Sequence, residues 1–159
     1  MENEAAALLE LFKEKGIDYT LYDHAPVYTS EEASRVRNVE LKTGVKAMLV
    51  REKGPEAHFL LVDIAADRRI DFPKLEALAN VKHFRFATRE EVLAQTKCEP
   101  GSVHPLGRLF GIPTYLDNSV LENEFVNFNI GLLTKSVRIR SRDLLKVMDP
   151  SLRGDFSKV

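Results

Sequence analysis

The stretch from Glu99 to Pro113 constrains this chain most, because it concentrates glycine and proline between two well-patterned segments. Three of the eight glycines and three of the seven prolines fall in its sequence, EPGSVHPLGRLFGIP. Proline fixes φ and lacks an amide donor, whereas glycine adopts backbone conformations that other residues avoid. The stretch therefore predicts a tight, preshaped loop whose free N–H groups can face a ligand. On these residues alone, a purely structural turn at Pro100-Gly101 is the alternative.

Length and composition favour an ordinary globular protein. A chain of 159 residues with 44% hydrophobic and 30% charged residues predicts one domain over 1–159. The net charge of −1 gives no overall attraction to nucleic acid, although a local basic face is compatible with it. The lone Cys98 allows no internal disulfide and has no neighbour that would activate it, which favours a reducing, cytoplasmic location and an inert thiol.

Two further classes are disfavoured by the sequence. No apolar run approaches the roughly 18 residues of a membrane span, and the acidic start, MENE, argues against a targeting peptide. The four histidines and the cysteine are too scattered for a zinc-binding pattern, so we expect no metal.

The apolar periodicity predicts helices interleaved with strands. Helices are expected over 2–15, from a Thr29 cap to about Arg37, over 73–79, from a Thr88 cap to about Thr96, and over 142–147 after a Ser141 cap. Strands are expected over 17–22, 45–51, 58–63, 83–87, 114–116, 124–130 and 136–140. The turn at 53–56 predicts an antiparallel pair, and the polar tail from Asp149 is expected to fray. The class is α+β, with a mixed, largely antiparallel sheet and helices outside it.

Lys46 is the most unusual residue of the predicted strands, because both faces of its strand are apolar. Lysine is rarely buried without a partner. Three interpretations remain open: the side chain reaches solvent from the strand end, pairs with a buried carboxylate such as Asp63, or lines a cavity and meets a ligand.

Other candidates are weaker. His104 lies inside the loop and can contact whatever the loop holds, or only solvent. Ser102 has neither a nucleophile-elbow motif nor an evident base. His24, before Ala-Pro, faces the same cavity or nothing, and Asp117 can be a simple turn residue.

The order of several short motifs resembles the YbaK-type family, which includes the editing domain inserted in bacterial prolyl-tRNA synthetase and its free-standing relatives. These motifs are His24-Ala-Pro26, Thr29-Ser-Glu-Glu32, Gly44-Val-Lys46, Gly101-Ser-Val-His-Pro105, Val126-Asn127 and Ser136-Val-Arg-Ile139. The resemblance covers nearly the whole chain. It implies a curved sheet, no cofactor, and hydrolysis of an amino acid wrongly attached to tRNA.

The resemblance also implies roles for particular residues. Lys46 would hold the terminal adenosine of the tRNA and its phosphate, and the loop from Gly101 to Pro105, with Ser102, Val103 and His104, would grip the aminoacyl carbonyl. His24 and Thr29 would contact the substrate, and Asp117 and Asn129 would shape the pocket. Arg35, Arg37 and Lys42 would touch the acceptor stem, unless they form a solvated charged face. The implied partners are mischarged tRNA, above all that for proline, and prolyl-tRNA synthetase.

The chain departs from one branch of this family, which removes alanine from the tRNA for proline. That branch carries Lys-Asn where this chain has Lys46-Ala47, and a histidine near the segment that here is Asn127-Phe128-Asn129. The amino acid removed therefore stays open among cysteine, alanine, serine, threonine and others. A non-catalytic module that binds tRNA or a synthetase, and a hydrolase of small esters, are the alternative functions.

Overall fold

A computed structural model describes residues 2–56 and 58–159. Its helices are α1 (Glu2–Glu14), α2 (Ser30–Arg37), α3 (Phe72–Ala79), α4 (Arg89–Thr96) and α5 (Ser141–Met148), with short 3₁₀ helices at Leu41–Thr43, Gly107–Phe110 and Asn118–Glu122. Its strands are β1 (Thr20–Asp23), β2 (Val45–Glu52), β3 (Phe59–Ala65), β4 (Arg69–Ile70), β5 (Phe84–Phe86), β6 (Thr114–Asp117), β7 (Phe125–Asn129), β8 (Lys135–Arg140), β9 (Leu152–Gly154) and β10 (Ser157–Lys158).

These strands pair mostly antiparallel, as the sequence predicts, but the described ranges form one mixed sheet and two antiparallel ones rather than a single sheet. In the described ranges, one sheet has the order β1-β8-β7 and a larger one the order β5-β2-β3-β6-β9, while β10 pairs with β4. The β2–β3 hairpin is antiparallel, with Lys46 opposite Ile64, whereas β3–β6 and β6–β9 are parallel. A parallel bridge between Gly44 and Asn127 joins the start of β2 to β7. This bridge brings the two larger sheets together where the polar side chains of β7 begin.

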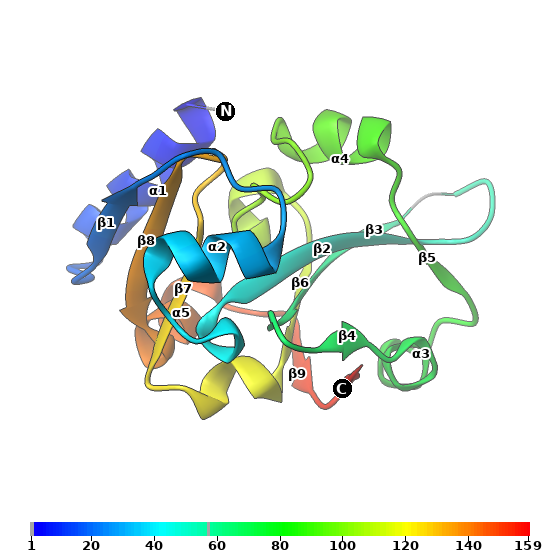
Figure 1. Ribbon diagram of the computed structural model, residues 1–159. Helices are drawn as coiled ribbons and strands as arrows, with labels where there is room; N and C mark the ends of the chain where they lie inside the picture. The colour runs from blue at the N-terminus through cyan, green and yellow to red at the C-terminus, as the bar shows by residue number, and fades with distance from the viewer. Residues whose placement is uncertain (1, 57) are drawn as a thin grey trace.

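Helices cover the sheets from outside, which confirms the predicted α+β class. Helix α1 lies beside the β1–β8 sheet, and α2 crosses in front of β2 (Figure 1). The fully buried Leu8, Phe12 and Leu144 of α1 and α5 pack with Phe128 and Ile139 of β7 and β8 in one core. In this described part of the chain, no helix is long and apolar enough to cross a membrane.

The predicted caps form as expected on two helices. Thr29 has an extended conformation and its Oγ1 accepts a hydrogen bond from the Glu32 amide at 3.1 Å, which starts α2. Thr88 and Glu91 form the reciprocal pair of hydrogen bonds that starts α4. These caps satisfy amides that the first helical turn leaves unpaired. The predicted Ser141 cap is wrong by one residue, since Arg140 precedes α5 without a side-chain cap.

The C-terminal segment does not fray, so that prediction is wrong. Strand β9 continues the larger sheet beside β6, and the Phe156 side chain is fully buried. The carboxylate of Asp117 accepts hydrogen bonds from the Phe156 amide and the Ser157 hydroxyl at 2.8 and 2.7 Å. Burial of an aromatic ring and a shared carboxylate together order a segment whose composition is polar.

The first strand also differs from its prediction. It begins at Thr20 rather than at residue 17, and Tyr19 and Leu21 are 40% and 41% exposed. Strand β1 lies at the edge of its sheet and pairs only with β8 among the described strands.

Candidate functional site

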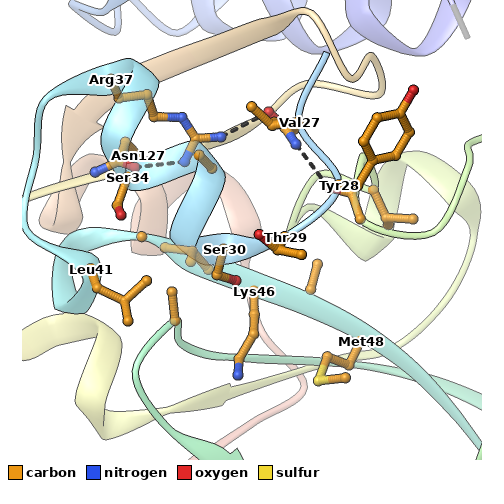
Figure 2. Close-up of a pocket in the computed structure, with 18 residues that line it drawn as sticks. Val27, Tyr28, Thr29, Ser30, Ser34, Arg37, Leu41, Lys46, Met48 and Asn127 are labelled. Atoms are coloured by element: carbon orange, nitrogen blue, oxygen red, sulfur yellow. Dashed lines mark hydrogen bonds between the residues drawn. The ribbon is translucent and has the colours of Figure 1, made fainter. Parts of the chain in front are cut away.

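A cavity of about 170 Å³ lies between α2, the start of β2, the Gly101 turn and β7. Segments far apart in the sequence form its walls, and they are drawn together in Figure 2. Its lining residues are Val27, Tyr28, Thr29, Ser30, Ala33, Ser34, Arg37, Leu41, Gly44, Val45, Lys46, Ala47, Met48, Ala66, Gly101, Val103, Asn127 and Asn129. The cavity is large enough for a small side chain and the groups attached to it, and it is open to solvent.

Lys46 enters this cavity from β2, below the first turn of α2 (Figure 2). The side chain is half-buried, and this burial lowers the pKa of its ammonium, against the opposing effect of Glu31 and Asp67. The interpretation that Lys46 pairs with Asp63 is wrong. Asp63 lies opposite Ala47, and successive residues of a strand face opposite sides, so the two side chains point apart. No ion pair of Lys46 occurs within residues 2–56 and 58–159.

The Gly101 turn forms another part of the lining of this cavity. Gly101 has φ of +90°, a conformation that side-chain-bearing residues rarely adopt. Its carbonyl accepts a hydrogen bond from Asn129 Nδ2 at 2.8 Å, and the Ser102 carbonyl accepts one from the Gly131 amide at 2.8 Å. Lys46 and two residues of the glycine–proline loop, Gly101 and Val103, thus line one cavity, and the substrate roles expected of them stay predictions.

A buried polar network supports this wall from behind. The Arg37 guanidinium donates hydrogen bonds of 2.8 Å to Ser136 Oγ, Asn127 Oδ1 and Asn129 Oδ1. Burial lowers the pKa of Arg37 to about 10, so it remains charged at neutral pH. His24 Nε2 lies 2.7 Å from Ser136 Oγ at the outer end of the network. His24 thus supports the cavity through Ser136 and does not itself line it.

Several predicted site residues lie outside the cavity lining. Ser102 is fully buried and its hydroxyl donates to the Glu99 carbonyl at 2.7 Å. His104 is fully buried, stacks on Phe110 with ring centroids 4.4 Å apart, and accepts a hydrogen bond from the Leu106 amide. Burial lowers the pKa of His104 to about 3, so the ring is neutral.

Pro105 is also buried and does not line the cavity, and Asp117 anchors the C-terminal segment. A role for Asp117 in shaping the pocket is therefore contradicted by its place in the fold. Burial raises the pKa of the Cys98 thiol to about 11, which agrees with its predicted inertness.

Sequence reasoning missed the buried role of Arg37. We expected it to touch tRNA or to lie on a solvated face, yet it is only 9% exposed. The sequence contained one signal for this burial. Arg37 lies four residues after the apolar Ala33, so the two share one face of α2, and that face is buried. Arg35 and Lys42, by contrast, are exposed as expected for residues of a charged surface.

The chemistry available here is that of binding and orientation. A half-buried ammonium, a turn with a positive-φ glycine, and a buried guanidinium converge on one small cavity. Among the described residues, no three histidine, cysteine, aspartate or glutamate side chains are close enough to hold a metal ion. The cavity offers cationic groups and backbone for an anionic or carbonyl-bearing ligand.

Comparison with known proteins gives a consistent picture. The family model described as "Aminoacyl-tRNA editing domain" matches residues 24–147. The "Multifunctional Ser/Thr-tRNA deacylase ProXp-y" of Escherichia coli is 28% identical over 151 residues, which cover 91% of this chain and 88% of that protein. The "Prolyl-tRNA editing protein ProX" of Acetoanaerobium sticklandii is 30% identical over 103 residues, which cover 65% of this chain and 62% of that protein.

A solved structure shares the fold. It is described as that of a candidate trans-editing enzyme for prolyl tRNA synthetase. It superposes with a TM-score of 0.79 over 98% of each chain, at 24% sequence identity.

Proposed function

This chain belongs to the aminoacyl-tRNA editing domain family, and we propose that it is a trans-acting deacylase that hydrolyses the ester of mischarged tRNA. The observation that carries the proposal is the convergence of Lys46 and the Gly101 turn on one small cavity. Its relatives are named as a Ser/Thr-tRNA deacylase and a prolyl-tRNA editing protein, which supports the same reaction here.

In this proposal the cavity binds the aminoacylated 3′ end of the tRNA. Lys46 holds the terminal adenosine and its phosphate, because its ammonium is half-buried and forms no ion pair within residues 2–56 and 58–159. The turn at Gly101 and Val103 faces the aminoacyl carbonyl, where backbone amides would stabilise a developing oxyanion. Thr29, at the start of α2, borders the same space.

The reaction needs no protein nucleophile. The oxygen of a water molecule forms a bond to the carbonyl carbon, and the bond from that carbon to the ribose oxygen then breaks. A proton from the water passes to the departing ribose oxygen, so the products are a free amino acid and intact tRNA. The neighbouring ribose hydroxyl of the substrate is suitably placed to relay this proton.

The substrate that we propose is the tRNA for proline carrying a small wrong amino acid. The cavity of about 170 Å³ suits a small side chain. The name of the Escherichia coli relative places serine and threonine first among the amino acids to test. We further propose that residues 1–159 act as a single editing domain, that the protein works in the cytoplasm, and that prolyl-tRNA synthetase is a partner.

A panel of mischarged tRNAs tests the proposal. Wild-type protein should release serine, threonine, alanine or cysteine from at least one tRNA well above the uncatalysed rate. Lys46→Ala should lower kcat/KM by about 10- to 100-fold, the range expected for losing one charged hydrogen bond. The matched control is Lys13→Ala, at an exposed position of α1 away from the cavity, which should match wild type.

The same panel separates the alternatives. Binding of tRNA without turnover would indicate a non-catalytic module. Equal turnover of free aminoacyl esters and of charged tRNA would indicate a hydrolase of small esters.

A further inference from the structure

The wall of the cavity contains a buried cation whose partners are all neutral. Arg37 is 9% exposed, and its three acceptors are the Ser136 hydroxyl and the side-chain amides of Asn127 and Asn129. No carboxylate lies within ion-pair distance of it in the described ranges. Desolvating a charge is costly, and neutral oxygens offset that cost less well than a carboxylate would. Such an arrangement suggests a role other than stability.

The guanidinium determines which way the Asn129 amide is turned. An arginine has only donors, so it can accept neither of the Asn129 N–H bonds and must face the Oδ1 end of that amide. Ser136 Oγ also donates to the same oxygen, at 2.9 Å. With Oδ1 held by these two donors, Nδ2 is directed to the opposite side, toward the Gly101 carbonyl 2.8 Å away.

The Gly101 turn depends on that orientation. If the Asn129 amide reversed, its oxygen would face the Gly101 carbonyl oxygen, and two acceptors would repel each other. The turn is also held by the Ser102 amide and hydroxyl, which donate to the Glu99 carbonyl at 3.0 and 2.7 Å, and by the Gly131 amide, which donates to the Ser102 carbonyl at 2.8 Å. The Asn129 bond is the one that anchors the residue with φ of +90° from outside the loop.

We propose that Arg37 is a positioning residue, which sets the shape of the Gly101–Val103 turn by fixing the orientation of the Asn129 amide. The inference rests on the proposed deacylase function and extends it to a residue that does not touch the reacting ester. Misplacing a catalytic wall by about 1 Å can cost roughly 100-fold in rate. The expected signature is therefore a lower kcat with little change in KM.

Two variants break the chain of contacts at different points. Arg37→Met removes the guanidinium and keeps a long side chain in the same space. Asn129→Asp keeps an acceptor for Arg37 and gives it a countercharge, but it replaces the Nδ2 donor to Gly101 with a second carboxylate oxygen. Both should lower kcat on mischarged tRNA by about 10- to 100-fold while KM stays within about threefold. The matched control is Arg142→Met, at an exposed position of α5 away from the cavity, which should keep the wild-type kcat.

Amide hydrogen exchange provides a readout that does not need activity. In Arg37→Met, the Ser102 and Gly131 amides should exchange at least about tenfold faster than in wild type. The Leu61 amide, bonded to the Pro113 carbonyl at 2.9 Å, reports on global folding and should be unchanged.

The outcomes separate this inference from the proposed function. A wild-type protein that clears no mischarged tRNA would defeat the function, while the exchange rates would still decide whether Arg37 positions the turn. Unchanged exchange at Ser102 and Gly131 in Arg37→Met would overturn the inference. So would a wild-type kcat in either folded variant of an active enzyme.

Discussion

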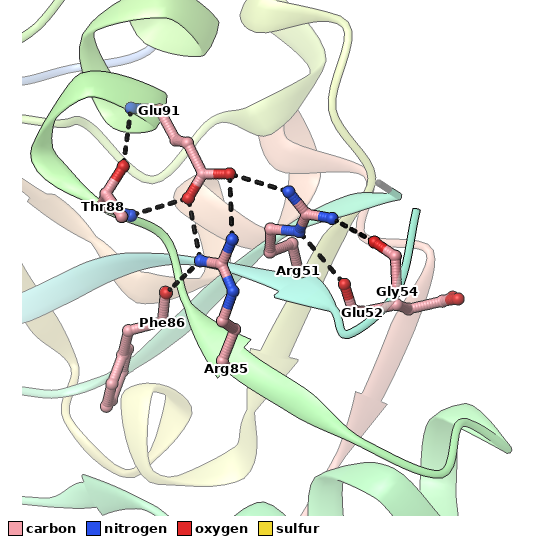
Figure 3. A network of polar contacts seen from close by, with 7 residues as sticks. All are labelled: Arg51, Glu52, Gly54, Arg85, Phe86, Thr88 and Glu91. Atoms are coloured by element: carbon pink, nitrogen blue, oxygen red, sulfur yellow. Dashed lines mark hydrogen bonds and ion pairs between the residues drawn. The ribbon is translucent and has the colours of Figure 1, made fainter. Parts of the chain in front are cut away.

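Two arginine clusters in this protein differ in how their charge is balanced. At the far end of β2, Glu91 of α4 accepts hydrogen bonds from Arg51 at 2.9 Å and from Arg85 at 2.8 and 3.2 Å (Figure 3). The Arg85 guanidinium is the main reason that the pKa of Glu91 lies well below its usual range. At the cavity, Arg37 meets only a hydroxyl and two amides.

The difference in charge balance indicates different roles: the Glu91 cluster holds structural elements together, whereas Arg37 belongs to the wall of the cavity. Glu91 shares its single negative charge between the two arginines and links α4 to β2 and β5, which is a structural task. Arg37 keeps its full charge beside a cavity, where an anionic ligand can complete the balance. We infer that the neutral partners of Arg37 distinguish the cavity wall from the Glu91 cluster at the other end of β2.

The largest expected effect is on catalysis. Arg37→Met should lower kcat on mischarged tRNA by about 10- to 100-fold, whereas Arg51→Met should leave it within about twofold, because Arg51 does not line the cavity. Single-turnover deacylation by variants whose folding is verified by circular dichroism measures both. An equal loss of kcat in the two variants would show that the two clusters do not differ in their effect on catalysis.

The next largest effect is expected when Arg37 receives a carboxylate partner, as the arginines of the Glu91 cluster have. Asn127→Asp places a carboxylate against the Arg37 guanidinium, whose bond to Asn127 Oδ1 is 2.8 Å. Balancing that charge should raise KM for tRNA by about two- to threefold, with a weaker dependence on salt. Initial rates at several salt concentrations give the answer, and a KM equal to that of wild type would show that the free charge of Arg37 is irrelevant to binding.

Asp63 is a buried ionisable group with even fewer partners than Arg37. Its carboxyl has neither a cation nor a hydrogen-bond partner in the described residues. Burial raises the pKa of this carboxyl well above its usual range. The folded protein therefore retains a proton that the unfolded chain releases, so this group costs stability increasingly as the pH rises above about 4. Asp63→Asn should raise Tm by at least about 3 °C at pH 8, and the gain should shrink toward pH 4.

Thermal denaturation at pH 8, 6 and 4 follows this difference directly. A gain in Tm that is the same at all three values would show that Asp63 does not titrate as described.

The smallest effect concerns the Glu91 cluster itself. Glu91→Gln preserves the cap of α4 but removes the charge between Arg51 and Arg85, and should lower Tm by about 2 °C. Because the pKa of Glu91 is depressed, its contribution is present at neutral pH and is lost as the pH falls through the folded-state pKa. The variant should thus approach wild type in strongly acidic solution. Glu90→Gln, in the same helical turn, is the control. An equal loss of Tm in that variant would show that the ion pairs of Glu91 do not stabilise the fold.

Local patterns predicted most of the elements. The caps at Thr29 and Thr88, the β2–β3 hairpin and the strands that became β7 and β8 were all visible in short stretches of sequence. Strands β4, β9 and β10 were not, because each is only two or three residues long and is held by partners distant in the chain. Phe156 and the Asp117 carboxylate order that tail through tertiary contacts, which periodicity does not report.

The site was predictable in outline and not in detail. Lys46 stood out because its strand was otherwise apolar, and the Gly101 loop because of its composition. His104 and Ser102 were expected at the cavity since they belong to the same loop, but a loop has two sides, and both residues face the core. Which side a loop residue faces depends on the neighbouring layers, and these are set by the whole fold.

The bridge between Gly44 and Asn127 has a consequence for biosynthesis. The cavity needs walls from both sides of that bridge, since Lys46 comes early in translation while Asn129 and its neighbour Ser136 come late. A nascent chain that ends before the final hairpin has the ammonium and the glycine turn but lacks the bonds that Asn129 and Gly131 make to that turn. The ribosome must therefore release most of this protein before the protein can begin to proofread translation.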